Sequence, residues 1–215
     1  GETEYFNSAF LFDVEGRIAG EYDKRHLVIG GEFIPLADLV PAAWQVAWGW
    51  PASITAGKES AVFRAGQGNV PLSPLICFED ILPALARADV RAGARMLVNV
   101  TNDAWFDARV QPRQHMRNAI LRAVENRVPL VRACNTGVTC AIEPSGRVAA
   151  FWSDGAGRTD GSGVLWADVP VPEDAASLTF YARYGDIYGI ACAAATVLWL
   201  AAALRKRRTT QRVPC

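Results

Sequence analysis

The sequence has little histidine, no net charge and no cluster of metal-ligating residues. Only His26 and His115 occur among 215 residues, and basic and acidic residues number 22 each. Two isolated histidines do not make a metal site, which needs several ligands at close spacing. Nucleic acid requires a concentrated basic surface, which zero net charge does not favour. Gly66 and Gly68 also lack the third glycine of a nucleotide loop. We therefore expect no metal, no cofactor and no nucleic-acid partner.

The number of cysteines is odd. An odd number excludes a complete set of internal disulfides. Cys134 and Cys140 flank a turn, so they either pair in an oxidising compartment or remain two small buried side chains. The five cysteines are Cys77, Cys134, Cys140, Cys192 and Cys215.

Charge is missing altogether from residues 187–204. Before this stretch lie 22 acidic and 17 basic residues, a net charge of −5, and after it lie five basic residues. Eighteen helical residues span about 27 Å, close to the thickness of a bilayer core. We expect a transmembrane helix over 187–204 and a basic cytoplasmic tail over 205–215, because basic flanks stay inside. The alternative is a helix buried in the core.

A second uncharged run, residues 39–57, contains prolines and glycines and is not expected to span a membrane. It carries Trp44, Trp48 and Trp50, and tryptophan favours the membrane interface. The run is either a loop that dips into lipid headgroups or an ordinary loop folded over its own core.

The start of the chain has neither an initiator Met nor a signal peptide. Residues 7–13 and 18–22 predict two strands joined by a turn, and a lone hairpin is rarely stable. We therefore expect that the N-terminal part of the protein is missing.

The rest of the domain alternates strands with helices, which indicates an α/β layered fold. Helices are expected at 81–92 and 111–127, the second with apolar residues at helical spacing. Strands are expected at 75–78, 96–100, 130–133, 139–142, 148–152 and 164–169.

Cys77 stands where an apolar strand meets a helix. A side chain there points to the open end of a sheet, and a helix N-terminus favours the thiolate. Cys77 is thus a candidate nucleophile, and the alternative is a buried structural cysteine. A nucleophile needs a base, but neither His26 nor His115 has an obvious orienting partner. His115 is more typical of a cap or a packing residue.

Several segments together resemble the nitrilase superfamily, and more narrowly the apolipoprotein N-acyltransferase family. The resemblance covers nearly the whole chain in order, including a C-terminal apolar helix with a basic tail that generic nitrilases lack. The matching segments are 22–28 (YDKRHLV), 31–35 (GEFIP), 77–79 (CFE), 99–106 (NVTNDAWF), 114–115 (QH) and 132–137 (RACNTG).

The resemblance implies an αββα sandwich and a Glu–Lys–Cys triad. Cys77 would be the nucleophile and Lys24 the oxyanion stabiliser, with the backbone N–H of Phe78 as a second donor. Glu32 and Glu79 would be supporting carboxylates. Asn102, Trp105, Trp44 and Trp48 would contact substrate. The general-base Glu has no match, so residues 1–215 alone are expected to be inactive.

Two positions depart from the family pattern. Phe78 replaces a common Tyr after the nucleophile, and residues 28–32 read VIGGE instead of VPFGE. Neither change removes a member of the triad, although the second loosens the Lys24 loop.

The implied reaction transfers an acyl chain from a phospholipid, through a Cys77 thioester, to the amine of a diacylglyceryl apolipoprotein. The resemblance implies a monomer in the bacterial inner membrane, with residues 1–180 as a catalytic domain on the periplasmic side. Two alternatives are a nitrilase-like amidase for a small amide and a membrane-tethered domain without catalysis.

Overall fold

The computed structural model describes residues 3–35, 54–66, 68–104, 110–159, 161–173 and 178–210. The expectations for Trp44, Trp48, Trp50 and Trp105 fall outside these residues.

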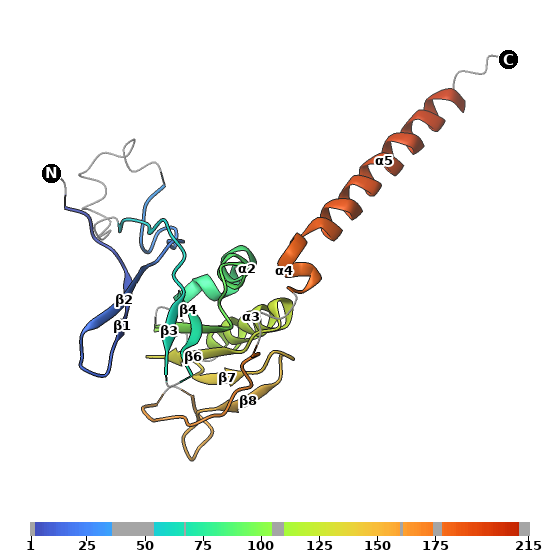
Figure 1. Cartoon of the computed structure of the whole chain (residues 1–215). Helices are drawn as coiled ribbons and strands as arrows, with labels where there is room; N and C mark the ends of the chain where they lie inside the picture. Colours follow the sequence, from blue (N-terminus) through green and yellow to red (C-terminus); the bar gives the residue numbers. More distant parts are fainter. Residues whose placement is uncertain are drawn as a thin grey trace.

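A six-stranded mixed sheet lies at the centre of the domain, in the order β3-β4-β5-β6-β7-β8 (Figure 1). Its three middle strands are parallel, and the outer pairs are antiparallel. The carboxyl ends of β4, β5 and β6 therefore meet at one edge, where open α/β sheets carry their sites. The strands are β3 (Phe63–Ala65), β4 (Val70–Ile76), β5 (Met96–Thr101), β6 (Leu130–Cys134), β7 (Cys140–Ile142) and β8 (Val148–Phe151).

Two helices, α2 (Pro83–Arg91) and α3 (Gln111–Asn126), cover one face of this sheet. Alternate strand residues point to that face and form the core with the helices. The opposite face is less covered, and Val100 remains 39% exposed there. The core includes Leu75, Ala86, Leu97, Ala119, Ala123, Leu130 and Ile142.

β4 tolerates Pro74 because its outer neighbour is short. β3 pairs only with residues 70–72 of β4. Beyond Leu72 one side of the strand has no ladder, so the missing N–H of Pro74 breaks no strand pairing. The strand ends at Ile76, and a short 3-10 turn, η2 (Cys77–Ile81), leads into α2.

A separate hairpin of β1 (Ser8–Phe12) and β2 (Ile18–Asp23) stands beside the sheet (Figure 1). The strand β2 runs directly into Lys24. The backbone N–H of Lys24 donates to Asn7 O, and its carbonyl accepts from Gly57 N–H. The residue before β1 and the segment before β3 thus both hold the backbone of Lys24.

At the other end, α4 (Phe180–Tyr184) is fastened to the domain before the last helix begins. The hydroxyl of Thr179 caps α4 at Ala182 N–H and donates to the carbonyl of Glu125. Gly185, with φ of 65°, ends α4, and α5 (Ile187–Thr210) extends away from the domain (Figure 1).

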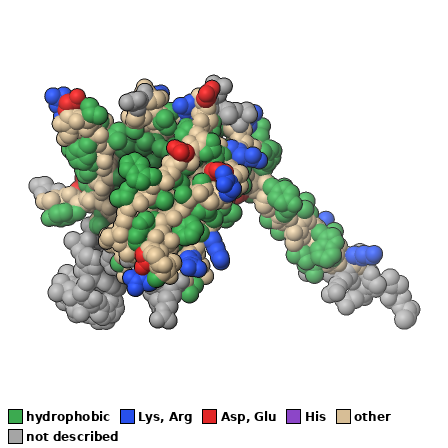
Figure 2. Space-filling model, turned by 90° about the horizontal axis from the view of Figure 1, so that it is seen from below, with side chains coloured by type: hydrophobic (Ala, Val, Ile, Leu, Met, Phe, Trp, Pro, Cys, Tyr) green, Lys and Arg blue, Asp and Glu red, His purple; other side chains and the backbone are tan. Residues whose placement is uncertain are grey.

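Among the described residues, only the window Ile187–Lys206 is long and apolar enough to cross a membrane. Its mean hydropathy is 2.0, and none of it is buried. A buried core helix, the alternative from the sequence, is therefore wrong. Figure 2 shows hydrophobic side chains along α5 and over the face of the domain seen from below.

Most of the expected elements form, with shifted ends. The main error is the strand expected at 164–169, which has no regular structure and leaves Trp166 90% exposed. Alternating apolar residues there have no partner strand among the described residues. The strand expected to reach residue 78 stops at Ile76, because Cys77 turns the chain.

Candidate active site

Cys77 occupies the sharp turn between β4 and η2. Its φ is 52°, a left-handed conformation that is uncommon for a residue with a side chain and typical of functional turns. The buried amide of Asn99 on β5 holds this turn by donating to the carbonyl of Cys77 at 2.9 Å. The half-buried thiol is free, so Cys77 is accessible but its backbone is fixed.

A cavity of about 500 Å³ opens at Cys77. It lies between the end of the sheet and the start of the hairpin, and it is lined by Asn7, Ser8, Gly31, Glu32, Ile54, Ile76, Cys77, Val100, Thr101 and Asn102. The predicted nucleophile, a predicted supporting carboxylate and a predicted substrate contact therefore share one cavity.

Lys24 is only 1% exposed and is paired with Glu32. Its ammonium donates to both carboxylate oxygens of Glu32, at 2.8 and 2.7 Å. Burial alone would raise the pKa of Glu32, but hydrogen bonds from Lys24, Val28 N–H and Asn7, with the Lys24 charge, lower it. Glu32 is therefore an anion that lines the Cys77 cavity and orients the Lys24 ammonium, although Lys24 itself is not among the lining residues.

Glu79 ties the Lys24 segment to the Cys77 turn. Its side chain is fully buried and accepts four hydrogen bonds at 2.8 to 3.0 Å. Two come from the backbone N–H groups of Arg25 and His26, one from Ile76 N–H and one from the hydroxyl of Tyr22. One carboxylate thus fixes residues on both sides of the cavity.

The Arg25 side chain reinforces this connection. It lies over the ring of Tyr22, with its Cζ atom 5.3 Å from the ring centroid. It also pairs with the buried carboxylate of Asp89 on α2 at 2.8 Å. Burial raises the pKa of Asp89 to about 6, against the opposing effect of Arg25. The segment that carries Lys24 is therefore anchored in the helix layer.

His115 has two orienting partners that the sequence did not reveal. Its ring nitrogens lie 2.8 Å from Asp103 and 2.7 Å from Asp80, and the side chain is buried. Of the two roles expected for it, the cap is wrong, whereas the structure does show a buried side chain. The only sequence signal was the helical spacing, which places residue 115 on the inner face of α3.

The remaining predicted site residues have different outcomes. Asn102 lines the cavity, and its side-chain oxygen accepts from Thr136 Oγ1 and Ala104 N–H. The Phe78 side chain is 38% exposed and does not line the cavity, so only its backbone remains a candidate. The roles expected for Trp44, Trp48 and Trp105 stay predictions.

Cys134 and Cys140 are both free, so the disulfide alternative is not realised. Burial raises the pKa of both thiols, for Cys140 to about 12.

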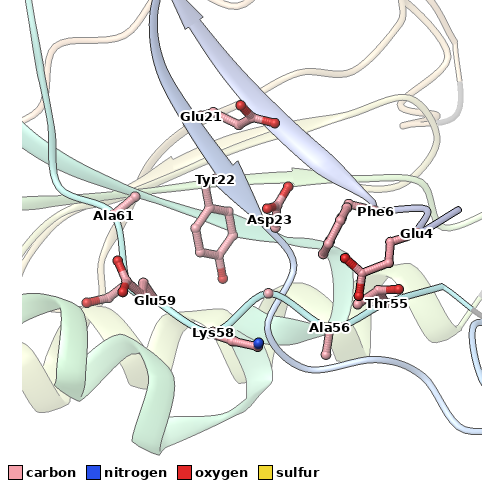
Figure 3. Close-up of a pocket in the computed structure, with 12 residues that line it drawn as sticks. Glu4, Phe6, Glu21, Tyr22, Asp23, Thr55, Ala56, Lys58, Glu59 and Ala61 are labelled. Atoms are coloured by element: carbon pink, nitrogen blue, oxygen red, sulfur yellow. The ribbon is translucent and has the colours of Figure 1, made fainter. Parts of the chain in front are cut away.

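A second pocket of about 470 Å³ lies on the other side of β2 (Figure 3). Its lining includes Glu4, Glu21, Asp23 and Glu59, but not Cys77. Within the described residues, no group of three or more His, Cys, Asp or Glu side chains is placed to hold a metal ion. The chemistry therefore concentrates at the Cys77 cavity.

Comparison with known proteins identifies the family of this chain. Residues 1–173 match the family described as carbon-nitrogen hydrolase. An apolipoprotein N-acyltransferase of Geobacter metallireducens is 42% identical, over 95% of this chain and 37% of its own length. Another from Bradyrhizobium diazoefficiens is 36% identical, over 99% of this chain and 37% of its own length. The chain thus spans little more than a third of these relatives.

Solved structures share the fold. Nit3 of Saccharomyces cerevisiae, a member of the nitrilase superfamily, has a TM-score of 0.52 at 17% identity, over 73% of this chain and 51% of its own. An amidase mutant from Nesterenkonia sp., with an acetamide moiety covalently added at its active site cysteine, has a TM-score of 0.50 at 22% identity, over 72% of this chain and 52% of its own. These likenesses confirm the nitrilase-like α/β fold. The chain belongs to the carbon-nitrogen hydrolase family, and within it the sequence is similar to the apolipoprotein N-acyltransferases.

Proposed function

We propose that this chain carries the nucleophile and oxyanion-stabilising residues of an apolipoprotein N-acyltransferase. The observation that supports this most is the left-handed Cys77 turn, which opens on a cavity lined by Glu32, the carboxylate that pairs with Lys24. The name of the relatives gives an apolipoprotein as the acyl acceptor. The family resemblance implies a diacylglyceryl form of that acceptor and a phospholipid as the acyl donor.

In the first step, the Cys77 thiolate attacks the carbonyl carbon of a phospholipid ester. The carbonyl oxygen becomes an oxyanion, which the Lys24 ammonium and the backbone N–H of Phe78 stabilise. The ester C–O bond then breaks, the lysophospholipid oxygen takes a proton, and a thioester remains on Cys77.

In the second step, the acceptor amine attacks the thioester carbon. The C–S bond breaks, the Cys77 thiolate is restored, and the nitrogen loses a proton as the amide forms. Glu32 is the only carboxylate among the described residues that line the cavity, and it is bound to Lys24. We therefore assign the role of proton acceptor to a different carboxylate, which is not among the described residues that line the cavity.

The membrane arrangement is part of the proposal. Residues 187–204 would span the inner membrane, with 205–215 in the cytoplasm and the catalytic residues 1–180 on the periplasmic side, as a monomer. The basic residues after 204 support this orientation. We assign Trp44, Trp48 and Trp105 to the entrance for acyl chains, beside Asn102.

Labelling with an alkyne-tagged phospholipid tests the function. The protein is expressed from its full reading frame and transferred into phospholipid micelles. It should then acquire a hydroxylamine-sensitive label on Cys77. Cys77→Ala should abolish the label. Cys134→Ala should retain it, because this half-buried free thiol lies outside the cavity.

The acceptor decides between transfer and hydrolysis. Addition of a diacylglyceryl peptide with a free N-terminal amine should discharge the label into an amide. Release of free fatty acid at the same rate with and without the peptide would indicate an amidase-like hydrolase. A wild-type protein without label would contradict the proposed function.

A further inference from the structure

Four charged side chains meet in the interior beside the Cys77 turn. They come from four segments: Asp80 in η2, Asp103 after β5, His115 on α3 and Arg132 on β6. None is more than 5% exposed. The acyl-transfer steps above use none of them directly.

His115 bridges the two carboxylates. Its Nδ1 lies 2.8 Å from Asp103 Oδ1, and its Nε2 lies 2.7 Å from Asp80 Oδ1. Arg132 donates to the other oxygen of Asp80, and its second terminal nitrogen lies 3.7 Å from Asp103 Oδ2. Both ring nitrogens face acceptors only, so both must carry a proton for the geometry to be favourable.

Charge balance leads to the same protonation state. Without a proton on His115, two carboxylates and one guanidinium would leave a buried net charge of −1, which is costly. An imidazolium makes the cluster neutral. The thiols of Cys134 and Cys140, which adjoin Arg132, do not change this sum because their pKa values are raised. Arg122, further along α3, is paired with Glu125.

The raised pKa of His115 agrees with a protonated side chain at neutral pH. Burial by itself would lower this pKa, and Arg132 opposes the proton as well. Hydrogen bonds to Asp103 and Asp80, with the charge of Asp80, outweigh both and raise the pKa to about 9.

The cluster joins two parts of the active site. Asp80 belongs to the same 3-10 turn as Cys77. Asp103 follows Asn102, which forms another part of the wall of the same cavity. The bridge through His115 thus sets how far the nucleophile turn lies from this wall.

We propose that His115 is an imidazolium at neutral pH and a positioning residue, whose two hydrogen bonds hold the Cys77 turn against the Asn102 wall so that acylation of Cys77 depends on its proton. This inference rests on the proposed function for its choice of reaction. It assigns His115 no contact with substrate.

The first test is the pH profile of Cys77 acylation by the alkyne-tagged phospholipid, in the full protein in micelles. The wild-type rate should fall above about pH 9 along a one-proton limb. Asp80→Asn should remove that limb, because a neutral imidazole can accept from the new amide while it still donates to Asp103. A wild-type limb that persists unchanged in Asp80→Asn would overturn the proposal.

The second test uses charge balance. His115→Gln leaves a buried negative charge and should slow acylation about 10- to 100-fold. The double variant His115→Gln/Asp80→Asn is neutral again and should recover most of the rate. Glu143→Gln, on the surface turn after β7, is the control and should not change it. Acylation of His115→Gln at the wild-type rate would refute a positioning role.

A lipid-free readout separates this inference from the proposed function. Alkylation of Cys77 by iodoacetamide at pH 7, followed by peptide mass spectrometry, needs no acyl donor. Slow alkylation in His115→Gln and its recovery in the double variant support positioning even if no lipid label forms. Equal alkylation in all variants overturns it. If His115→Gln does not fold, the pH profile of Cys77 acylation in Asp80→Asn decides whether the proposal holds.

Discussion

At the scale of single residues, buried carboxylates organise this site. Glu32 orients an ammonium, whereas Glu79 gathers four donors from two segments that lie more than 50 positions apart in the chain. A buried donor that loses its acceptor costs about 1–3 kcal/mol. These acids therefore determine the shape of the cavity as well as its charge.

The first prediction concerns Glu79. In Glu79→Gln one acceptor oxygen becomes an NH₂ group that faces N–H donors, so at least two donors lose their partner. We expect a loss of about 3 kcal/mol in the free energy of unfolding, measured by thermal or denaturant unfolding in micelles. Glu143→Gln, whose partner Arg147 has a side chain that is 69% exposed, should lose under about 1 kcal/mol. Equal losses would contradict the assigned role of Glu79.

The second prediction concerns pH and stability. The pKa of His115 is raised from 6.5 to about 9 in the folded state, so folding takes up a proton. Its contribution to stability is complete below pH 6.5 and is lost as pH rises through 9, at up to about 1.4 kcal/mol per pH unit. Unfolding midpoints measured from pH 6 to 10 should show this fall. His115→Gln should be less stable at pH 6 and should lose the dependence, and a dependence that survives the substitution would count against the bridge.

At the scale of elements, the site depends on how the turns that follow the strands pack against one another. The turn after β6 meets the loop after β5, where Asp103 N–H donates to the carbonyl of Thr136. Gly137 follows with φ of 117°, and a Cβ there would lie 2.5 Å from Asp103 Oδ2. This glycine allows the turn to approach the carboxylate that holds His115.

The third prediction compares two glycines. Gly137→Ala combines a forbidden conformation with a clash and should cost about 3 kcal/mol. It should also slow Cys77 acylation, because Asp103 must move. Gly157→Ala has a positive φ but no atom within 4 Å, so it should cost only about 1 kcal/mol and leave the rate unchanged. Unfolding and labelling of both variants test this, and similar rates would show that the turn does not set the site.

At the scale of the whole molecule, a folded α/β domain is joined to one long apolar helix. Arg87 donates to the carbonyl of Ala182 at 3.1 Å, and Thr179 anchors the start of α4. The apolar helix α5 therefore begins from a fixed point on the domain. Lipid substrates and a membrane-spanning anchor agree with each other in the proposed function.

The fourth prediction tests α5 as the anchor. Val197→Lys places a charge near the middle of the apolar window and should cost about 2.5–3.5 kcal/mol of insertion free energy. Ile187→Lys, at the end of the helix, should cost much less because its ammonium can reach the interface. The fraction of protein that resists carbonate extraction should drop only for Val197→Lys. Equal extraction of both variants would argue against a spanning helix.

The sequence by itself determined the local features of this protein. The apolar run after residue 186 indicated α5, and helical spacing indicated α3. The strand end before Cys77 made this residue a candidate nucleophile, because strand ends and sharp turns depend on a few adjacent residues. The role of Lys24 was implied by the family resemblance, and both roles stay predictions. The strand expected at 164–169 does not form. An alternating pattern of apolar residues is a local feature, and it predicts a strand without specifying a neighbouring strand to pair with.

Only the tertiary structure decided which distant side chains satisfy one another. Glu79 accepts hydrogen bonds from the segment after β2 and from the end of β4. His115 joins Asp80 to Asp103, so that three separate segments meet. Periodicity can indicate that such residues are buried, but burial does not name the partner. Buried charges require donors or counter-charges at hydrogen-bond distance, and the packing of α3 against β5 and β6 chooses which residues provide them.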